Sequence, residues 1–194
     1  MFILQEESPP MTASPSTGSA QPSPYSDDFT SDRWAWLAGT YWYVPTETLP
    51  ALQVVDIREQ RSRIINDQTL WFIERYESGY LIGRAAISLD GAEFSPLTMV
   101  GSVTPLGDVS VSFASTDTVS LSLRDGVTTA SLSTGAGRMI QRDGVWAFLM
   151  QMTNGTGAGN VTHWSYMVQS TPSDESWANL PGMPGVSIGD VFAE

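Results

Sequence analysis

Four polar side chains have residue types that acid–base or hydrogen-bonding chemistry uses: Glu74, Arg84, Gln151 and His163. Arg84 follows Glu74 across a short turn, close to where a hairpin partner of Glu74 falls, so we expect an ion pair between them. A buried charge must be paired, which makes this pair a candidate catalytic group. The alternative is an ordinary cross-strand pair worth a few tenths of a kcal/mol to about 1 kcal/mol.

The strand that carries Glu74 contains ionisable and aromatic residues on both faces. Alternation places Phe72, Glu74 and Tyr76 on one face and Trp71, Ile73 and Arg75 on the other. Whichever face turns inward, we expect one ionisable group to enter the interior with aromatic neighbours.

The C-terminal hairpin contains the densest aromatic and methionine sequence of the chain. It runs from Trp146 to Thr153, through a glycine-rich turn, and on from Val161 to Val168. Gln151 and His163 stand on its two facing strands, where an amide and an imidazole can bind a ligand carbonyl or enol. The alternative is that His163 is a satisfied histidine near the rim of a sheet.

Aromatic and methionine side chains on the same strands supply candidate walls for an apolar ligand. The substrate-binding candidates are Trp42, Trp71, Phe72, Tyr76, Trp146, Phe148, Met150, Trp164 and Tyr166. For Trp42, the alternative is a place in the hydrophobic core, where aromatic residues are common.

Composition excludes several classes of catalysis. The chain of 194 residues has 0 Cys and 1 His, and all 9 of its basic residues are arginine. Thiolate nucleophiles, Cys-ligated zinc, iron–sulfur clusters, Schiff bases and multi-histidine metal sites are therefore excluded. We expect no cofactor and no metal. The formal charge of -12 argues against a nucleic-acid partner.

From Trp34 onward, short apolar runs alternate with turn signals, which is typical of all-β proteins. The turns expected to join strands are Glu77–Gly79, Asp90–Gly91, Pro105–Asp108, Asp125–Gly126 and Asp143–Gly144. The expected strands are 39–45, 69–77, 79–89, 97–104, 108–114, 118–124, 127–133, 137–142, 145–153 and 160–169.

These strands predict an antiparallel up-and-down β-barrel of about 8–10 strands, because closure removes the edges that a long meander leaves exposed. An open sandwich is the alternative fold. One short helix is expected at 46–60, where Thr46 and Pro50 resemble a helix start, with a strand at 52–57 as the competing interpretation. Several strands are apolar on both faces, so a helix, a tail or a second copy must cover the outside; we favour a C2 homodimer.

The chain divides into two parts. Residues 1–33 are rich in proline, serine and threonine and predict a flexible N-terminal tail. The apolar residues Met1–Leu4 make this tail a candidate lid, and disorder without a function is the alternative. Residues 34–194 form the β-barrel domain, with an extended C-terminal segment from Pro172 that packs on another part of the fold.

The N-terminal sequence has no basic region before its glutamates, and no window approaches the roughly 20 apolar residues of a membrane span. We therefore expect a cytoplasmic protein without a membrane partner.

Gly39 begins an aromatic-rich first strand that continues through Tyr41 and Trp42. This start resembles that of lipocalin-like, or calycin-type, β-barrels, in which a Gly-x-Trp pattern lets a tryptophan close one end. In this chain the tryptophan is one position further on, and the resemblance covers only the first strand and its flanks. It implies a calycin-type barrel with a hydrophobic cavity.

In size and architecture the chain is also similar to the small cofactor-free barrels that catalyse intramolecular Diels–Alder cyclisation in spirotetronate and spirotetramate biosynthesis. This similarity implies a cofactor-independent cyclase or isomerase that folds a hydrophobic, polyketide-like molecule. The alternative function is a non-catalytic carrier or sensor of a hydrophobic small molecule. Convergent polar groups inside the cavity favour turnover, whereas a purely apolar cavity favours carriage.

Overall fold

The computed structural model describes residues 31–56, 59, 61–92, 95–115, 132–156, 159–173 and 187–193. The expected lid and most of the expected tail lie outside these ranges. So do the predicted strand 118–124, most of the predicted strand 127–133 and the turn Asp125–Gly126.

Nine strands and three short helical segments make up the described chain. The strands are β1 (Thr40–Tyr43), β2 (Pro50–Asp56), β3 (Arg61–Glu77), β4 (Tyr80–Leu89), β5 (Ser95–Val103), β6 (Asp108–Ser115), β7 (Leu132–Arg142), β8 (Val145–Thr156) and β9 (Gly159–Ser170). The helical segments are the 3-10 helices η1 (Ser31–Leu37) and η2 (Thr46–Thr48) and the α-helix α1 (Ile188–Val191).

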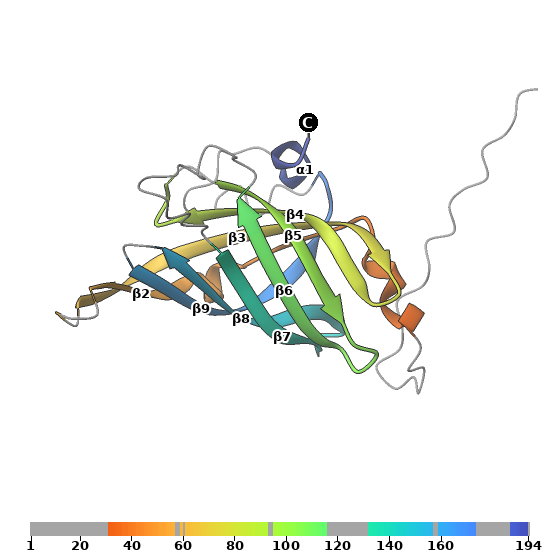
Figure 1. Cartoon of the computed structure of the whole chain (residues 1–194). Helices are drawn as coiled ribbons and strands as arrows, with labels where there is room; N and C mark the ends of the chain where they lie inside the picture. Colours follow the sequence, from red (N-terminus) through yellow and green to blue (C-terminus); the bar gives the residue numbers. More distant parts are fainter. Residues whose placement is uncertain are drawn as a thin grey trace, which may run out of the picture.

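The strands form one closed antiparallel sheet in up-and-down order (Figure 1). β1 and β2 both pair with β3 on one side and β9 on the other, because η2 interrupts a single strand position. The pairing of β3 with β4 completes the ring. The nine strands therefore occupy eight positions of a barrel, which confirms the predicted all-β up-and-down barrel.

Tight turns join several of the strands where the sequence predicts them. Asp143 and Gly144 have φ values of 51° and 82°, and Ser78 and Gly79 have φ values of 48° and 93°. Two consecutive positive φ values are typical of the turn that matches the twist of a β-hairpin. Local turn chemistry thus sets where these strands end.

The predicted helix at 46–60 is wrong, and the competing strand is correct. Among the described residues of this stretch only η2 is helical, and β2 follows it from Pro50 to Asp56. Pairing with two neighbouring strands satisfies the backbone of β2, which outweighs the weak helix propensity of the segment. β3 is also longer than expected, since it begins at Arg61 rather than at residue 69.

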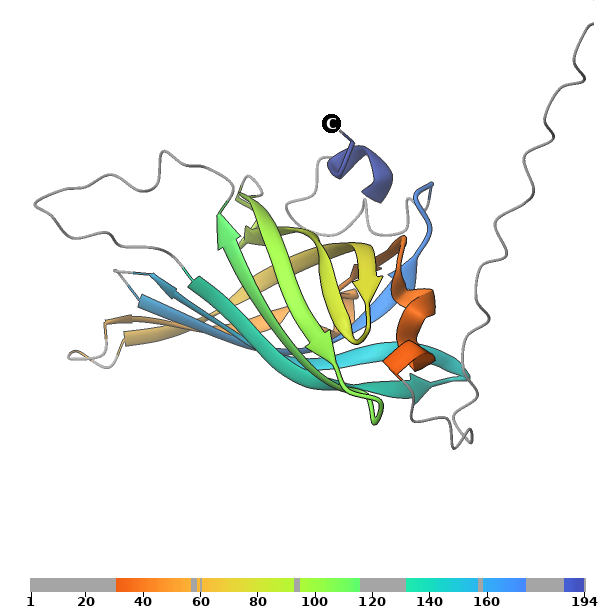
Figure 2. The ribbon, with the colours of Figure 1, turned by 45° about the vertical axis from the view of Figure 1, so that its right-hand side comes forward.

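One end of the barrel is closed by a tryptophan plug, which we define as Trp34, Trp36, Trp42 and Trp146. Trp34 of η1 is 1% exposed, packs edge-on against Trp146 with ring centroids 5.0 Å apart, and donates its indole N–H to the Thr104 carbonyl at 2.9 Å. Figures 1 and 2 show η1, in orange, at this end of the barrel. The plug leaves the opposite end as the place for a cavity.

The C-terminal segment covers part of the outer surface of the barrel. Phe192, at the end of α1, packs against Phe72 and Tyr41 with ring centroids 5.9 Å and 6.3 Å apart, and Ile188 is fully buried. Residues 187–193 therefore pack on the barrel, with 188–191 helical rather than extended, while residues 174–186 of the predicted segment lie outside the described residues. Ser187 and Asp190 cap the helix reciprocally.

Candidate functional site

A pocket opens between strands β3 to β9 at the end of the barrel opposite the tryptophan plug. Its cavity volume is about 30 Å³, and about 360 Å³ of space is free of protein atoms when the open solvent at the mouth is included. We call this hollow the cup. Its lining comprises Asp67, Thr69, Ile87, Leu97, Phe113, Ser133, Met152, Thr153, Asn154 and Val161. Hydrophobic side chains make most of the exposed wall, with polar groups gathered on β3, β7 and β8.

Alternation along β3 brings two polar side chains to the wall of the cup. Asp67, Thr69 and Trp71 all face inward, and Trp71 lies deeper, with its ring centroid 5.7 Å from that of Phe113. The Thr69 hydroxyl donates to Asp67 Oδ1 at 3.2 Å. Phe113 is therefore part of the cup wall and Trp71 packs behind it.

His163 on β9 lies beside Asp67, although β3 and β9 are not neighbours there. Between them the strand position shared by β1 and β2 is interrupted at η2, and the His163 ring fills the gap. Its Nε2 lies 2.5 Å from the Thr48 carbonyl oxygen, and its Nδ1 lies 3.4 Å from Asp67 Oδ2. The His163 side chain is 1% exposed and that of Asp67 is 11% exposed. The break in the strand thus creates a buried imidazole–carboxyl pair.

Buried polar atoms without a hydrogen-bond partner among the described residues here include His163 Nδ1 and Ser165 Oγ on β9, and Gln68 Oε1 and Trp71 Nε1 on β3. Ser165 is 0% exposed and shares the inner face of β9 with His163. The 3.4 Å approach of Asp67 to Nδ1 is an ion-pair distance without the geometry of a hydrogen bond. Buried polar atoms of this kind carry a cost of about 1–3 kcal/mol each.

Five of the predicted binding residues lie in the filled part of the barrel: Trp42, Trp71, Trp146, Phe148 and Met150. Phe148 packs edge-on against Trp42 and Trp71, at 4.6 Å and 5.3 Å between ring centroids. None of the five is among the described residues that line the cup. These five residues therefore belong to the hydrophobic core, which is the alternative position given above for Trp42.

Gln151 and His163 do not face one ligand. In the β8–β9 ladder, His163 pairs with Met152 and Gln151 pairs with Trp164. Directly paired residues share a face, so His163 points inward while Gln151 and Trp164 lie on the outer surface, where Trp164 is 62% exposed. The expected arrangement is wrong because Gln151 pairs with Trp164 rather than with His163, so the Gln151 and His163 side chains lie on opposite faces of the sheet.

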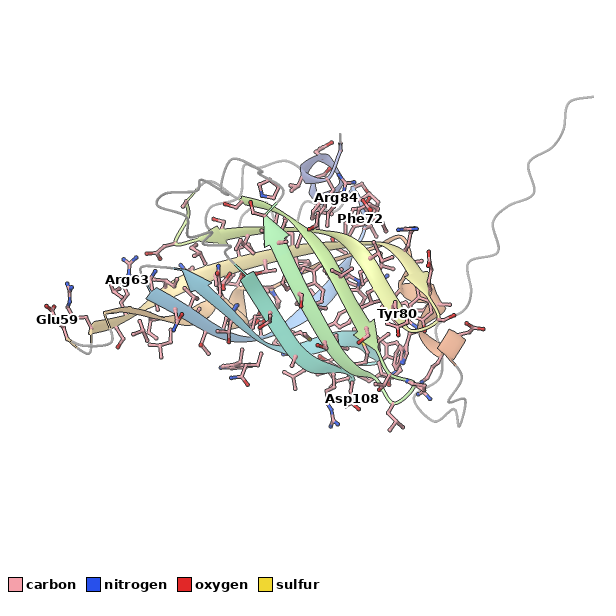
Figure 3. All side chains as sticks on the ribbon, viewed as in Figure 1. Glu59, Arg63, Phe72, Tyr80, Arg84 and Asp108 are labelled. Atoms are coloured by element: carbon pink, nitrogen blue, oxygen red, sulfur yellow. The ribbon has the colours of Figure 1, made fainter. Side chains whose placement is uncertain are left out.

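The predicted Glu74–Arg84 ion pair is present, with 2.6 Å between Glu74 Oε1 and Arg84 Nε. It lies on the outer surface, where the Arg84 guanidinium also stands over the Phe72 and Phe192 rings at 5.7 Å and 5.9 Å. Figure 3 shows Arg84 and Phe72 beneath α1. Through its contact with Phe192, Arg84 helps to hold residues 187–193 against the barrel.

A β-bulge explains why neither Glu74 nor Arg75 enters the barrel. Ile73 pairs with Gly83 and Arg75 pairs with Ile82, so Glu74 has no partner residue on β4. The extra residue shifts the alternation, and both charged side chains turn outward. The expected inward position of Glu74 or Arg75 is therefore wrong, although Asp67, nearer the start of the same strand, does face inward.

The remaining two predicted binding residues lie away from the cup. Tyr76 packs on the core near the tryptophan plug, and burial is the largest effect that raises the pKa of its phenol. The charge of Asp32 also raises this pKa, while backbone hydrogen bonds from Gly79 and Trp34 lower it. Tyr166 lies under the Arg142 guanidinium, 3.9 Å from its ring centroid.

Sequence reasoning missed Asp67, Thr69 and the other cup residues. The available signal was the polar run Asn66–Thr69 directly before the apolar residues of a strand. Inward polar residues at a strand end indicate a barrel mouth, but placing the start of this strand at residue 69 left most of the run in a loop.

No three His, Asp or Glu side chains of the described residues gather to hold a metal ion. No described helix has the length and apolar character needed to cross a membrane. No family model, curated protein or solved structure matches the chain.

Proposed function

We propose that this protein binds a hydrophobic small molecule in the cup. The observation that carries the proposal is a hollow in the mouth of a barrel whose other end is plugged by tryptophan. Five apolar side chains, Ile87, Leu97, Phe113, Met152 and Val161, line it together with a few polar groups. This combination of apolar wall and sparse polar groups is typical of small-molecule sites.

The test uses Prodan, an uncharged naphthalene dye without hydrogen-bond donors, whose emission increases in apolar surroundings. Leu97→Trp places a larger side chain in the cup, and Val100→Trp is the matched control, since Val100 lies on the same strand and is 57% exposed on the outside. We expect saturable binding to the wild type and to Val100→Trp, and a loss of about tenfold or more in Leu97→Trp. Equal binding by all three folded proteins would contradict the proposal.

A second candidate function is a cofactor-independent cyclase or isomerase acting on the bound, polyketide-like molecule. The observation that favours it is the Asp67–His163 pair at the wall of the cup, at 3.4 Å between Oδ2 and Nδ1. Such a pair can take a proton from one carbon of an enolisable substrate and return it to another, so that no atom is gained or lost. The resemblance to Diels–Alder barrels supports the same candidate by architecture alone.

Deuterium uptake separates turnover from carriage. In D2O, an isomerase of this kind exchanges the acidic C–H of a bound cyclic ketone, and Asp67→Asn abolishes the exchange. A rate equal to the uncatalysed rate would leave carriage or sensing as the function. A cytoplasmic location and a homodimer stay predictions.

A further inference from the structure

The polar side chains that β3 contributes to the wall of the cup, Asp67 and Thr69, offer acceptors to a ligand. The Thr69 hydroxyl donates its hydrogen bond to Asp67 Oδ1, so only the lone pairs of the hydroxyl oxygen remain for other partners. A carboxylate offers about four lone-pair sites, and the contacts of Asp67 with Thr69 and His163 account for two of them. Asp67 therefore faces the cup with acceptor capacity to spare.

The His163 ring supplies no donor to the cup, because its side chain is 1% exposed and does not belong to the described lining. A carbonyl oxygen only accepts, so the contact with Thr48 requires a proton on Nε2. Nδ1 lies 3.4 Å from Asp67 Oδ2.

Asp67 lines the cup and His163 lies behind it. The oxygen end of the pair therefore faces the ligand space. The opposite wall contributes Ser133 and Asn154, a hydroxyl and an amide, whose dipoles do not compensate a buried anion.

No cation balances a negative ligand in the described part of the cup. The chain has no lysine, and no arginine belongs to the described lining. Arg61, Arg63 and Arg138 keep 63%, 59% and 65% of their side chains exposed on the outer surface. The formal charge of -12 adds a long-range field of the same sign as a carboxylate ligand.

We propose that the ligand of the cup is an apolar molecule whose polar end donates a hydrogen bond, as a hydroxyl or an amine does, to Asp67 and Thr69. This inference rests on the proposed function and adds the chemical class of the ligand. An apolar molecule that ends in a carboxylate is disfavoured by these acceptors and by the absence of a cation from the described lining.

Three probes with the same hydrocarbon chain test the proposal: octanol, octylamine and octanoate, measured by calorimetry against the full chain. We expect the alcohol and the amine to bind about tenfold or more tightly than the carboxylate, since a hydrogen bond to a carboxyl group replaces a repulsion. Asp67→Leu should remove the preference, while Asp108→Asn, which changes a carboxylate 56% exposed on the outside, should keep it.

The outcomes separate this inference from the proposed function. Octanoate binding as tightly as the other two would overturn the donor assignment. Binding of Prodan in the cup without binding of octanol or octylamine would also overturn the donor assignment, and it would leave the proposed function standing. Failure of Prodan to bind in the cup would overturn the proposed function itself. If Asp67→Leu does not fold, Thr69→Val replaces it, with the same loss of preference expected.

Discussion

Replacing Trp34 with alanine should strongly destabilise the closed end of the barrel. Trp34 is 1% exposed, packs edge-on against Trp146, and donates a hydrogen bond of 2.9 Å to the Thr104 carbonyl. η1 has no strand pairing of its own, so this side chain is a main attachment of η1 to the barrel.

The magnitude follows from burial. A tryptophan side chain buries up to about 250 Å², which at about 25 cal/mol per Å² corresponds to roughly 6 kcal/mol as an upper bound. Truncation of a buried tryptophan costs about 3–5 kcal/mol in practice, and the lost hydrogen bond adds about 1 kcal/mol. We therefore expect the free energy of unfolding to fall by about 4–6 kcal/mol.

Urea unfolding followed by far-UV circular dichroism measures this loss without depending on tryptophan emission. The matched control is Trp164→Ala, since Trp164 is 62% exposed on the outer surface; we expect a loss below about 1 kcal/mol there. Equal losses for the two variants, or a loss below about 1 kcal/mol for Trp34→Ala, would refute the assignment of Trp34 to the plug. Trp34→Phe, expected to lose about 1–2 kcal/mol, serves if the alanine variant does not fold.

Two further predictions concern Arg84 and Tyr76. Arg84→Gln should lower the free energy of unfolding by about 1–2 kcal/mol, because it removes a half-buried ion pair and two ring contacts. The control Arg75→Gln breaks an exposed ion pair and should lower the free energy of unfolding by less than about 0.5 kcal/mol. Equal losses for the two variants in urea unfolding would contradict the role given to Arg84. Because the pKa of the Tyr76 phenol is raised on folding, the folded chain keeps the phenol proton at a pH where the unfolded chain, with a pKa near 10, has lost it. The contribution of Tyr76 to the free energy of unfolding is therefore fully present below about pH 10, and it is lost as the pH rises through the folded pKa. Tyr76→Phe should show a shallower loss in alkaline urea unfolding, and an identical slope in both proteins would exclude this role.

Much of the fold could be predicted from the sequence because turns and alternation are local properties. Asp143–Gly144 and Ser78–Gly79 adopt the positive φ values that their residue types favour, and the strands on either side follow. The predicted Glu74–Arg84 pair is present for the same reason, since only a short hairpin separates the two residues.

The candidate site could be predicted much less well. Alternation tells which residues share a face but not which face turns inward, and the bulge at Glu74 reversed that relation within one strand. Gln151 and His163 were placed together because they stand on facing strands, whereas a register one residue different puts them on opposite sides of the sheet.

The sequence by itself determined an acidic all-β chain without thiol, lysine or multi-histidine chemistry, since composition and local turn geometry need no tertiary contact. Only the tertiary structure decided that Asp67 and His163 form a pair at the mouth of the barrel. The two residues lie far apart in the chain, and they meet because closure brings β3 and β9 to either side of one strand position that η2 interrupts. No local periodicity encodes that meeting, because it depends on how the whole sheet closes.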